Sequence, residues 1–187
     1  MPAIPPTSHV ALKEWDSTIT ALARGVQILI LRKGGIHESG GEFELEHRSF
    51  VFFPTFLHQS PAQVKPAYHD LLTHTSAEPQ IVHVRAGATV ARIIEVKSRP
   101  SIEAIDDQHI YAKPLIDMRF SYRPTSPLYV VLLRVWEFDQ PVELQNTPDY
   151  AGCKSWVPLK TPVDSQGRWV LSDAEFAQRA KNLASLC

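Results

Sequence analysis

The sequence predicts an α+β fold: a small β-barrel of mixed, largely antiparallel strands, flanked by helices at the N- and C-termini. Apolar and β-branched runs of strand length recur along the chain and alternate with short turns rich in Gly and Pro. Few helical patterns lie between these runs. With 187 residues, 44% of them hydrophobic, the chain is long enough to bury one core without disulfides.

The N-terminal part begins with a Pro-rich stretch, residues 1–7, expected to be a flexible tail before a single globular domain over residues 8–187. Apolar residues at spacings of three and four from Val10 predict an amphipathic helix that ends at Gly25, with Ser8 as its N-cap. The apolar run at 26–31 then predicts a strand buried on both faces.

The middle of the chain is predicted to be mostly strands. Expected strands are 42–47, which alternates, 50–53, which ends at a proline, and 80–85 and 89–97 around a turn at 86–88. Short helices are expected after Pro61, at 102–105 and at 114–120. The longest strand is expected at 128–138, in the centre of the sheet.

The C-terminal part combines an irregular stretch with a helix. Four prolines between 141 and 162 predict an ordered excursion over the surface. Ser172 and Glu175 have the spacing of a capping box, which predicts that a helix begins at residue 173.

Composition narrows the function classes. A formal net charge of -1 argues against a non-specific nucleic-acid binder, which usually carries a clear basic excess, although a local basic face is compatible with this charge. Two cysteines favour a reducing compartment. The N-terminus has no signal-peptide pattern and no apolar run could span a bilayer, so we expect a cytoplasmic protein without a membrane partner. Histidine and cysteine spacings predict neither a metal site nor a cofactor.

Several motifs, in a fixed order, resemble one family: ALKEW, LRKGGI, FVFFPTFLHQ, VLLRVW and above all YAGCKSWVPL. They are similar to those of domain of unknown function 1802, a bacterial family frequent in cyanobacteria. This resemblance covers nearly the whole chain and implies no activity.

A second resemblance concerns the order of the elements. A helix ending in ARG, a strand ending in LRKG, a strand VFFPT and a late strand VLLRVWEF are similar to PUA-like domains of the ASCH and EVE branches. The resemblance implies a PUA-like barrel that binds RNA or a modified base. Gln27 stands where the ASCH pattern has a lysine, while Arg32 fits the end of that pattern, so ASCH-type hydrolase chemistry is not expected.

The leading hypothesis is a non-catalytic protein that binds RNA or a nucleotide-like ligand. Arginine and lysine would hold anionic groups, aromatic rings would stack on bases, and polar side chains of the turn after 50–53 would contact base edges. The candidate residues are Arg32, Lys33, Thr55, His58, Gln59, Arg119, Tyr150, Lys154, Ser155 and Trp156. They are expected to meet in one cleft, although packing of Tyr150 and Trp156 into the barrel end is an equally good interpretation.

Two alternatives stay open. A small hydrolase acting on a nucleic acid or a modified nucleoside could use Glu95, Lys97 and His58, or Cys153 and Ser155 beside Lys154. Glu95 and Lys97 could equally be an exposed ion pair on a strand. An accessory protein could instead dock a partner through the Pro-rich stretch 141–162. The oligomeric state cannot be inferred from the sequence.

Overall fold

The computed structural model describes residues 3–33, 36–39, 42–57, 59–152, 154–183 and 186, with the backbone alone at 36–39 and 42–44. The strands are β1 (Thr7–Trp15), β2 (Leu29–Arg32), β3 (Ile36–Ser39), β4 (Glu42–Leu45), β5 (Ser49–Thr55), β6 (Ile81–Val96), β7 (Leu128–Gln145), β8 (Trp156–Asp164) and β9 (Gly167–Trp169). The α-helices are α1 (Asp16–Ala23), α2 (Arg99–Glu103), α3 (Lys113–Ser121) and α4 (Asp173–Asn182). The 3₁₀ segments are η1 (Pro61–Gln63), η2 (Pro66–Leu71), η3 (Asp106–Gln108) and η4 (Pro148–Tyr150).

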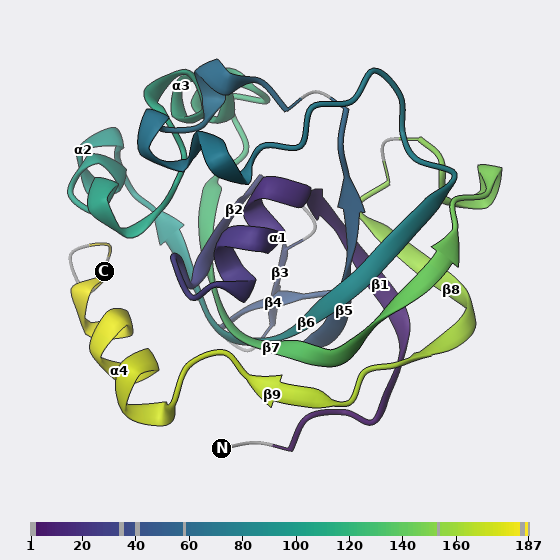
Figure 1. The fold of residues 1–187 in the computed structure, drawn as a ribbon. Helices are drawn as coiled ribbons and strands as arrows, with labels where there is room; N and C mark the ends of the chain where they lie inside the picture. Colours follow the sequence, from purple (N-terminus) through teal and green to yellow (C-terminus); the bar gives the residue numbers. More distant parts are fainter. Residues whose placement is uncertain are drawn as a thin grey trace.

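One mixed sheet organises the fold. Its strands follow the order β2-β7-β6-β5-β1-β8, and β9 pairs with β7 beyond the end of β2. β1 and β5 are parallel, whereas the other neighbours are antiparallel. The sheet curls around α1, which lies in its hollow (Figure 1). The pairings of the described strands end at β2 and β8, so the α+β class is confirmed but the sheet does not close into a barrel.

Apolar side chains fill both faces of the curled sheet. The inner face packs against Ile19 and Leu22 of α1, and its strands contribute Leu12, Ile30, Phe50, Phe52, Val131 and Leu133. The outer face near β1, β5 and β8 has its own cluster, which includes Ala11, Val51, Phe53 and Trp136. Burial on both faces explains why 128–138 lacks a polar alternation.

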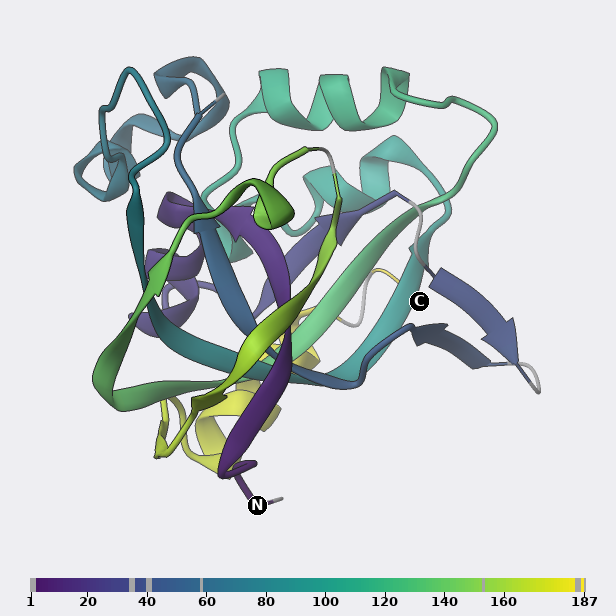
Figure 2. The ribbon, with the colours of Figure 1, turned by 90° about the vertical axis from the view of Figure 1, so that its right-hand side faces the viewer.

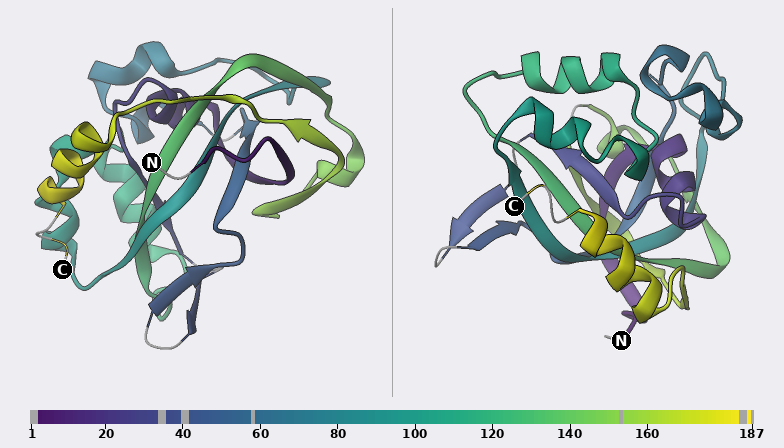
Figure 3. Two further views of the ribbon diagram at one scale, coloured as in Figure 1. Left: turned by 90° about the horizontal axis from the view of Figure 1, so that it is seen from below. Right: turned by 90° about the vertical axis from the view of Figure 1, so that its left-hand side faces the viewer.

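Helices cover one end of the sheet. α2, α3 and η2 gather there, at the top of Figure 1, and pack on a third cluster that includes Leu29, Leu31 and Leu115. The β3–β4 hairpin projects from the body (Figure 2), and α4 lies outside the sheet, apart from the hairpin (Figure 3). None of the described helices is long and apolar enough to cross a membrane.

The expected N-terminal helix was wrong in its bounds. The predicted helix from Val10 to Gly25 begins only at Asp16, because residues 7–15 form a strand between β5 and β8. Ladder hydrogen bonds on both sides of β1 override its helical periodicity. The carbonyls of Pro5 and Pro6 accept hydrogen bonds from Ser165, so part of the expected tail is tied to the sheet.

The predicted turn at 86–88 is also absent. β6 runs without interruption from Ile81 to Val96 and pairs with β7 along its length. Gly87 instead makes room for Trp136, since a Cβ at this position would lie 2.3 Å from the indole ring. The glycine therefore serves packing rather than chain reversal.

The C-terminal helix confirms its sequence signature. Ser172 accepts a hydrogen bond from the Glu175 amide, and the Glu175 carboxylate accepts from the Ser172 amide. Hydrogen bonds from the Ser172 hydroxyl and amide hold the pKa of Glu175 below its usual range.

Candidate functional site

Arg32, the last residue of β2, is a partly buried cation that the protein leaves without a direct partner. It shares a strand face with Ile30, which lies in the inner cluster. None of the described residues forms a hydrogen bond or an ion pair with its guanidinium. Burial lowers the pKa of Arg32; the Glu14 charge opposes this shift and the Arg119 charge adds to it.

Glu14 supplies a carboxylate near Arg32. It lies on β1, which is next to the last strand at the end of the sheet order opposite to β2. It is 9% exposed and follows Leu12 on the inner face of β1. Its Oε1 accepts a hydrogen bond from the Trp15 amide at 3.0 Å. β1 and β2 are far apart in the sheet order, but the sheet curls around α1 (Figure 1), and the Glu14 charge acts on Arg32.

Arg119 supplies a second cation from α3. Its Nε atom is buried and makes no hydrogen bond within the part of the chain that the structure describes. The backbone around it is held firmly, because Lys33 Nζ donates to the carbonyls of Arg119 and Phe120, each at 3.0 Å. Lys33 therefore caps the C-terminal end of α3 and fixes where Arg119 lies.

Tyr111 completes the group. Its hydroxyl accepts a hydrogen bond from Gln27 Nε2 at 3.2 Å, while Gln27 Oε1 accepts from the Ile110 amide at 3.0 Å. Burial raises the pKa of Tyr111, and the neighbouring Glu14 charge raises it further, so the phenol stays neutral. We call Glu14 of β1, Arg32 of β2, and Tyr111 and Arg119 of the helical cover the seam cluster, because their charges and the phenol act on one another across the curled sheet.

The seam cluster carries a local positive charge. Two arginines face one carboxylate and one neutral phenol, and neither arginine has an ion-pair partner among the described residues. Partly buried polar groups are normally hydrogen-bonded, and an unpaired buried charge is costly. Guanidinium groups bind phosphate and carboxylate oxygens through paired hydrogen bonds. The arrangement is suited to an anionic ligand.

Two of the predicted site residues, Thr55 and Gln59, bind the backbone next to the seam cluster. Thr55 Oγ1 donates to the Glu14 carbonyl at 3.1 Å. Gln59 Oε1 accepts from the Ser17 amide at 3.1 Å, and its Nε2 donates to the carbonyls of Thr55 and Phe56. Both side chains fix the junction between β1 and α1 that positions Glu14.

Trp156 and Tyr150 lie on opposite faces of the sheet. Trp156 pairs with Leu12, packs edge-on against His47 and Phe50, and is partly exposed, but its Nε1 is buried without a described partner. Tyr150 is 6% exposed, packs against Phe53 in the outer cluster and accepts a hydrogen bond from the Lys160 amide. The two rings therefore cannot stack on one base, and we leave Tyr150 out of the proposed site.

The remaining predicted residues contribute less. Lys154 and Ser155 are exposed, and the Ser155 carbonyl accepts from the Lys13 amide at 2.8 Å. His58, Cys153 and the glycines of the 34–41 loop lie outside the described residues. The predicted three-loop cleft, which depends on these residues, therefore stays a prediction. Among the described site residues, Arg32 and Arg119 come together, with Lys33 beside them.

Glu95 and Lys97, named for the hydrolase alternative, bind each other. Lys97 Nζ lies 3.1 Å from Glu95 Oε1, and the lysine is exposed. Glu95 pairs with Tyr129, which pairs with Arg32. Two strand spacings, about 10 Å, thus separate Glu95 from Arg32. The ion pair is the ordinary surface arrangement expected on a strand.

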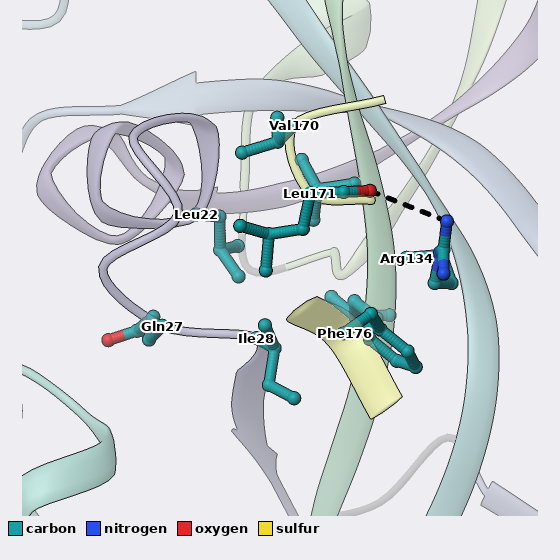
Figure 4. A pocket seen from close by; sticks show the side chains of 9 residues that line it. Leu22, Gln27, Ile28, Arg134, Val170, Leu171 and Phe176 are labelled. Carbon is teal, nitrogen blue, oxygen red and sulfur yellow. Dashed lines mark hydrogen bonds between the residues drawn. The ribbon is translucent and has the colours of Figure 1, made fainter. Parts of the chain in front are cut away.

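A small hollow lies elsewhere, between α1 and α4 (Figure 4). Its walls are mostly apolar and include Leu22, Ile28 and Phe176. Its one charged group, Arg134, is bound to Asp173 at 2.7 Å. The hollow is part of the packing of α4 rather than a polar site.

Sequence reasoning missed Glu14 and Tyr111. Glu14 was hidden because the wrongly predicted helix placed it on an exposed face, whereas strand alternation would have put it beside Leu12 inside the fold. Tyr111 lies just before α3 in a segment without regular pattern, and no local signal marks it.

Comparison with known proteins identifies the family. The model of the family described as "Domain of unknown function (DUF1802)" matches residues 11–182. The chain belongs to the DUF1802 family. A search of curated proteins finds no match. Thus family membership is shown and carries no activity with it.

Among solved structures, this DUF1802 protein is similar to ASCH of Zymomonas mobilis, the branch that the sequence resembles. A serine-to-alanine mutant matches with 14% identity and a TM-score of 0.45, over 96% of this chain and 99% of that one. A tyrosine-to-phenylalanine mutant matches with 12% identity and a TM-score of 0.47, over 93% and 96%. ASCH itself matches with 13% identity and a TM-score of 0.44, over 93% and 94%.

Proposed function

We propose that this DUF1802 protein binds RNA or a nucleotide-like ligand without catalysis, and that Arg32 and Arg119 hold its phosphate. The observation that carries the proposal is the Arg32 guanidinium, partly buried and with no described protein partner. A charge in such a place is expected to be neutralised by something outside the fold. A phosphate group does so with two guanidiniums at once.

The carboxylate beside the arginines favours a nucleotide over a bare anion. Glu14 would repel a simple anion, but it can accept a hydrogen bond from a ribose hydroxyl or a base N–H. A ligand that combines an anion with such donors satisfies all three charged groups. Trp156, partly exposed on the same inner face as Leu12 and Glu14, adds a ring against which a base could pack.

The test is RNA binding by fluorescence anisotropy with a labelled twelve-residue oligouridine at several salt concentrations. We expect Arg32→Ala and Arg119→Ala each to weaken binding about tenfold and to lower the salt slope by about 0.7 for each lost phosphate contact. Arg168→Ala is the matched control, because this arginine of β9 is 79% exposed and pairs with Glu137 of β7. The Arg168→Ala variant should bind RNA with the affinity of the wild type.

Thermal unfolding separates binding from a structural role. Because Arg32 makes no described bond, Arg32→Ala should leave Tm unchanged or raise it. Two outcomes would contradict the proposal: a wild-type protein that retains no RNA at any salt concentration, or an Arg32→Ala protein that binds RNA normally.

A further inference from the structure

Tyr122, at the C-terminal end of α3, is an exposed aromatic residue that packing does not explain. It is 51% exposed, more than any other large hydrophobic side chain among the described residues. Its backbone is nevertheless ordered, since its amide donates to the Met118 carbonyl at 2.9 Å and closes the last turn of the helix. The ring is thus presented to solvent from a fixed position.

Arg123 lies beside this ring and has a strained backbone. Its φ of 45° lies in the left-handed region, and it is the one residue other than glycine with positive φ in the described part of the chain. Its guanidinium lies 5.3 Å from the centroid of the Tyr122 ring. An arginine there is less favourable than glycine or asparagine, and such strain is most often found at functional sites.

A neighbouring arginine–aromatic pair makes the same contact, but its arginine also has carboxylate partners. Arg99 lies 5.2 Å from the Phe120 ring, but it also pairs with Asp117 and Glu103. Among the described residues, no carboxylate forms an ion pair with Arg123. The Tyr122–Arg123 pair is therefore the one whose cation and ring are both available to a ligand.

This pair is close to the seam cluster. Tyr122 follows Arg119 by three residues, which is less than one helical turn of about 5.4 Å. Lys33 holds the carbonyls of Arg119 and Phe120, so both features are fixed to the same end of β2. The stretch 118–123 contains two arginines and two aromatic rings and no acidic residue.

From this arrangement we infer that Tyr122 and Arg123 form a stacking subsite for an unpaired base, and that the ligand of the seam cluster is single-stranded RNA. The inference rests on the proposed function. A ring with a cation beside it binds the face of a base, and that face is free only in a single strand. A phosphate held at Arg32 and Arg119 would place the next nucleotide at this subsite.

The experiment compares three probes: labelled twelve-residue oligouridine, the same strand in a duplex with oligoadenosine, and uridine 5′-monophosphate as a competitor. The wild type should prefer the single strand over the duplex and over the mononucleotide. Tyr122→Ala should weaken binding of the single strand about tenfold, which is the order expected for one stacked base. It should leave competition by the mononucleotide unchanged.

Two further variants make the result specific to stacking. Tyr122→Phe keeps the ring and should bind the single strand within about twofold of the wild type. Arg123→Gly should weaken binding severalfold while raising Tm by about 2 °C, because it relieves the strained backbone. A 2-aminopurine base in the strand should change its fluorescence on binding the wild type but not Tyr122→Ala.

The outcomes separate this inference from the proposed function. If Tyr122→Ala binds the single strand normally while Arg32→Ala does not, the stacking subsite is refuted and the anion site stands. If the mononucleotide or the duplex binds as tightly as the single strand, the substrate class is refuted. If the wild type binds none of the probes, both proposals fail.

Discussion

Mild acid should destabilise this fold through one buried histidine. His109 is 2% exposed, and both ring nitrogens are buried without a hydrogen-bond partner among the described residues. The pKa of His109 is lowered from 6.5 to about 4, chiefly by burial and next by the charge of Lys65. Lys65 Nζ donates a hydrogen bond to the His109 carbonyl at 2.9 Å. Asp106 and Asp107 act in the opposite direction, with smaller effect.

The magnitude follows from the two pKa values. The unfolded chain protonates this imidazole at its ordinary pKa, whereas the folded chain keeps it neutral down to about pH 4. The stability that the neutral His109 contributes is therefore complete above pH 6.5, and it is lost as the pH falls from 6.5 to about 4. The total loss is about 3 kcal/mol, of which about 2 kcal/mol is gone at pH 5.

Urea unfolding between pH 7.5 and 4.5 measures this loss against His109→Phe. The His109 and Tyr111 ring centroids lie 5.4 Å apart, and phenylalanine keeps a ring at this position. The substitution removes no described hydrogen bond, because neither ring nitrogen of His109 makes one. Other groups titrate equally in both proteins, so the difference between their free energies of unfolding isolates His109. That difference should change by about 2 kcal/mol from pH 7.5 to pH 5. A difference that does not vary with pH would refute the reasoning.

Two substitutions test the packing around the site and the sheet. Gln27→Leu should lower the free energy of unfolding by about 2 kcal/mol, because it leaves the buried Ile110 amide unpaired; an unchanged urea midpoint would contradict this. Gly87→Ala should cost about 3 kcal/mol or more, since its Cβ would lie 2.3 Å from the Trp136 ring; a tryptophan fluorescence melt like that of the wild type would contradict it. Gly152→Ala, where a Cβ meets nothing within 4 Å, is the control for the second change and should lose only about 1 kcal/mol from its positive φ.

Elements with local signals could be predicted from the sequence, and elements specified by distant partners could not. The capping box at Ser172 and the apolar run of β7 are local, and both were predicted correctly. β1 has apolar residues at spacings that fit a helix as well as a strand. Its state is decided by β5 and β8, which follow it by some 40 and 140 residues.

The site divides in the same way. Arg32 and Arg119 were predicted as cations that hold an anionic group, and Arg32 also fits the end of the ASCH pattern. Their proximity depends on how far the sheet curls, which no pattern in the sequence specifies. Glu14 became visible only once the strand character of β1 was known, because strand alternation places it on the same inner face as Leu12.

Other arginines of the same fold show what a structural role looks like. Arg134 is 8% exposed, bonds Asp173 at 2.7 Å, and lies over the rings of Trp169 and Phe176. Arg85 pairs with Asp16 at 2.7 Å and donates to Thr20 at 2.6 Å.

Each of these guanidiniums is satisfied within the chain, so removing it should destabilise the protein. Arg32 has no such bonds among the described residues, and the nearby Glu14 carboxylate attracts it without reaching ion-pair distance. Replacing Arg134 should therefore lower Tm and replacing Arg32 should not, although both are partly buried. That contrast, more than the number of positive charges, distinguishes a cation that holds the fold together from one that we propose to bind a ligand.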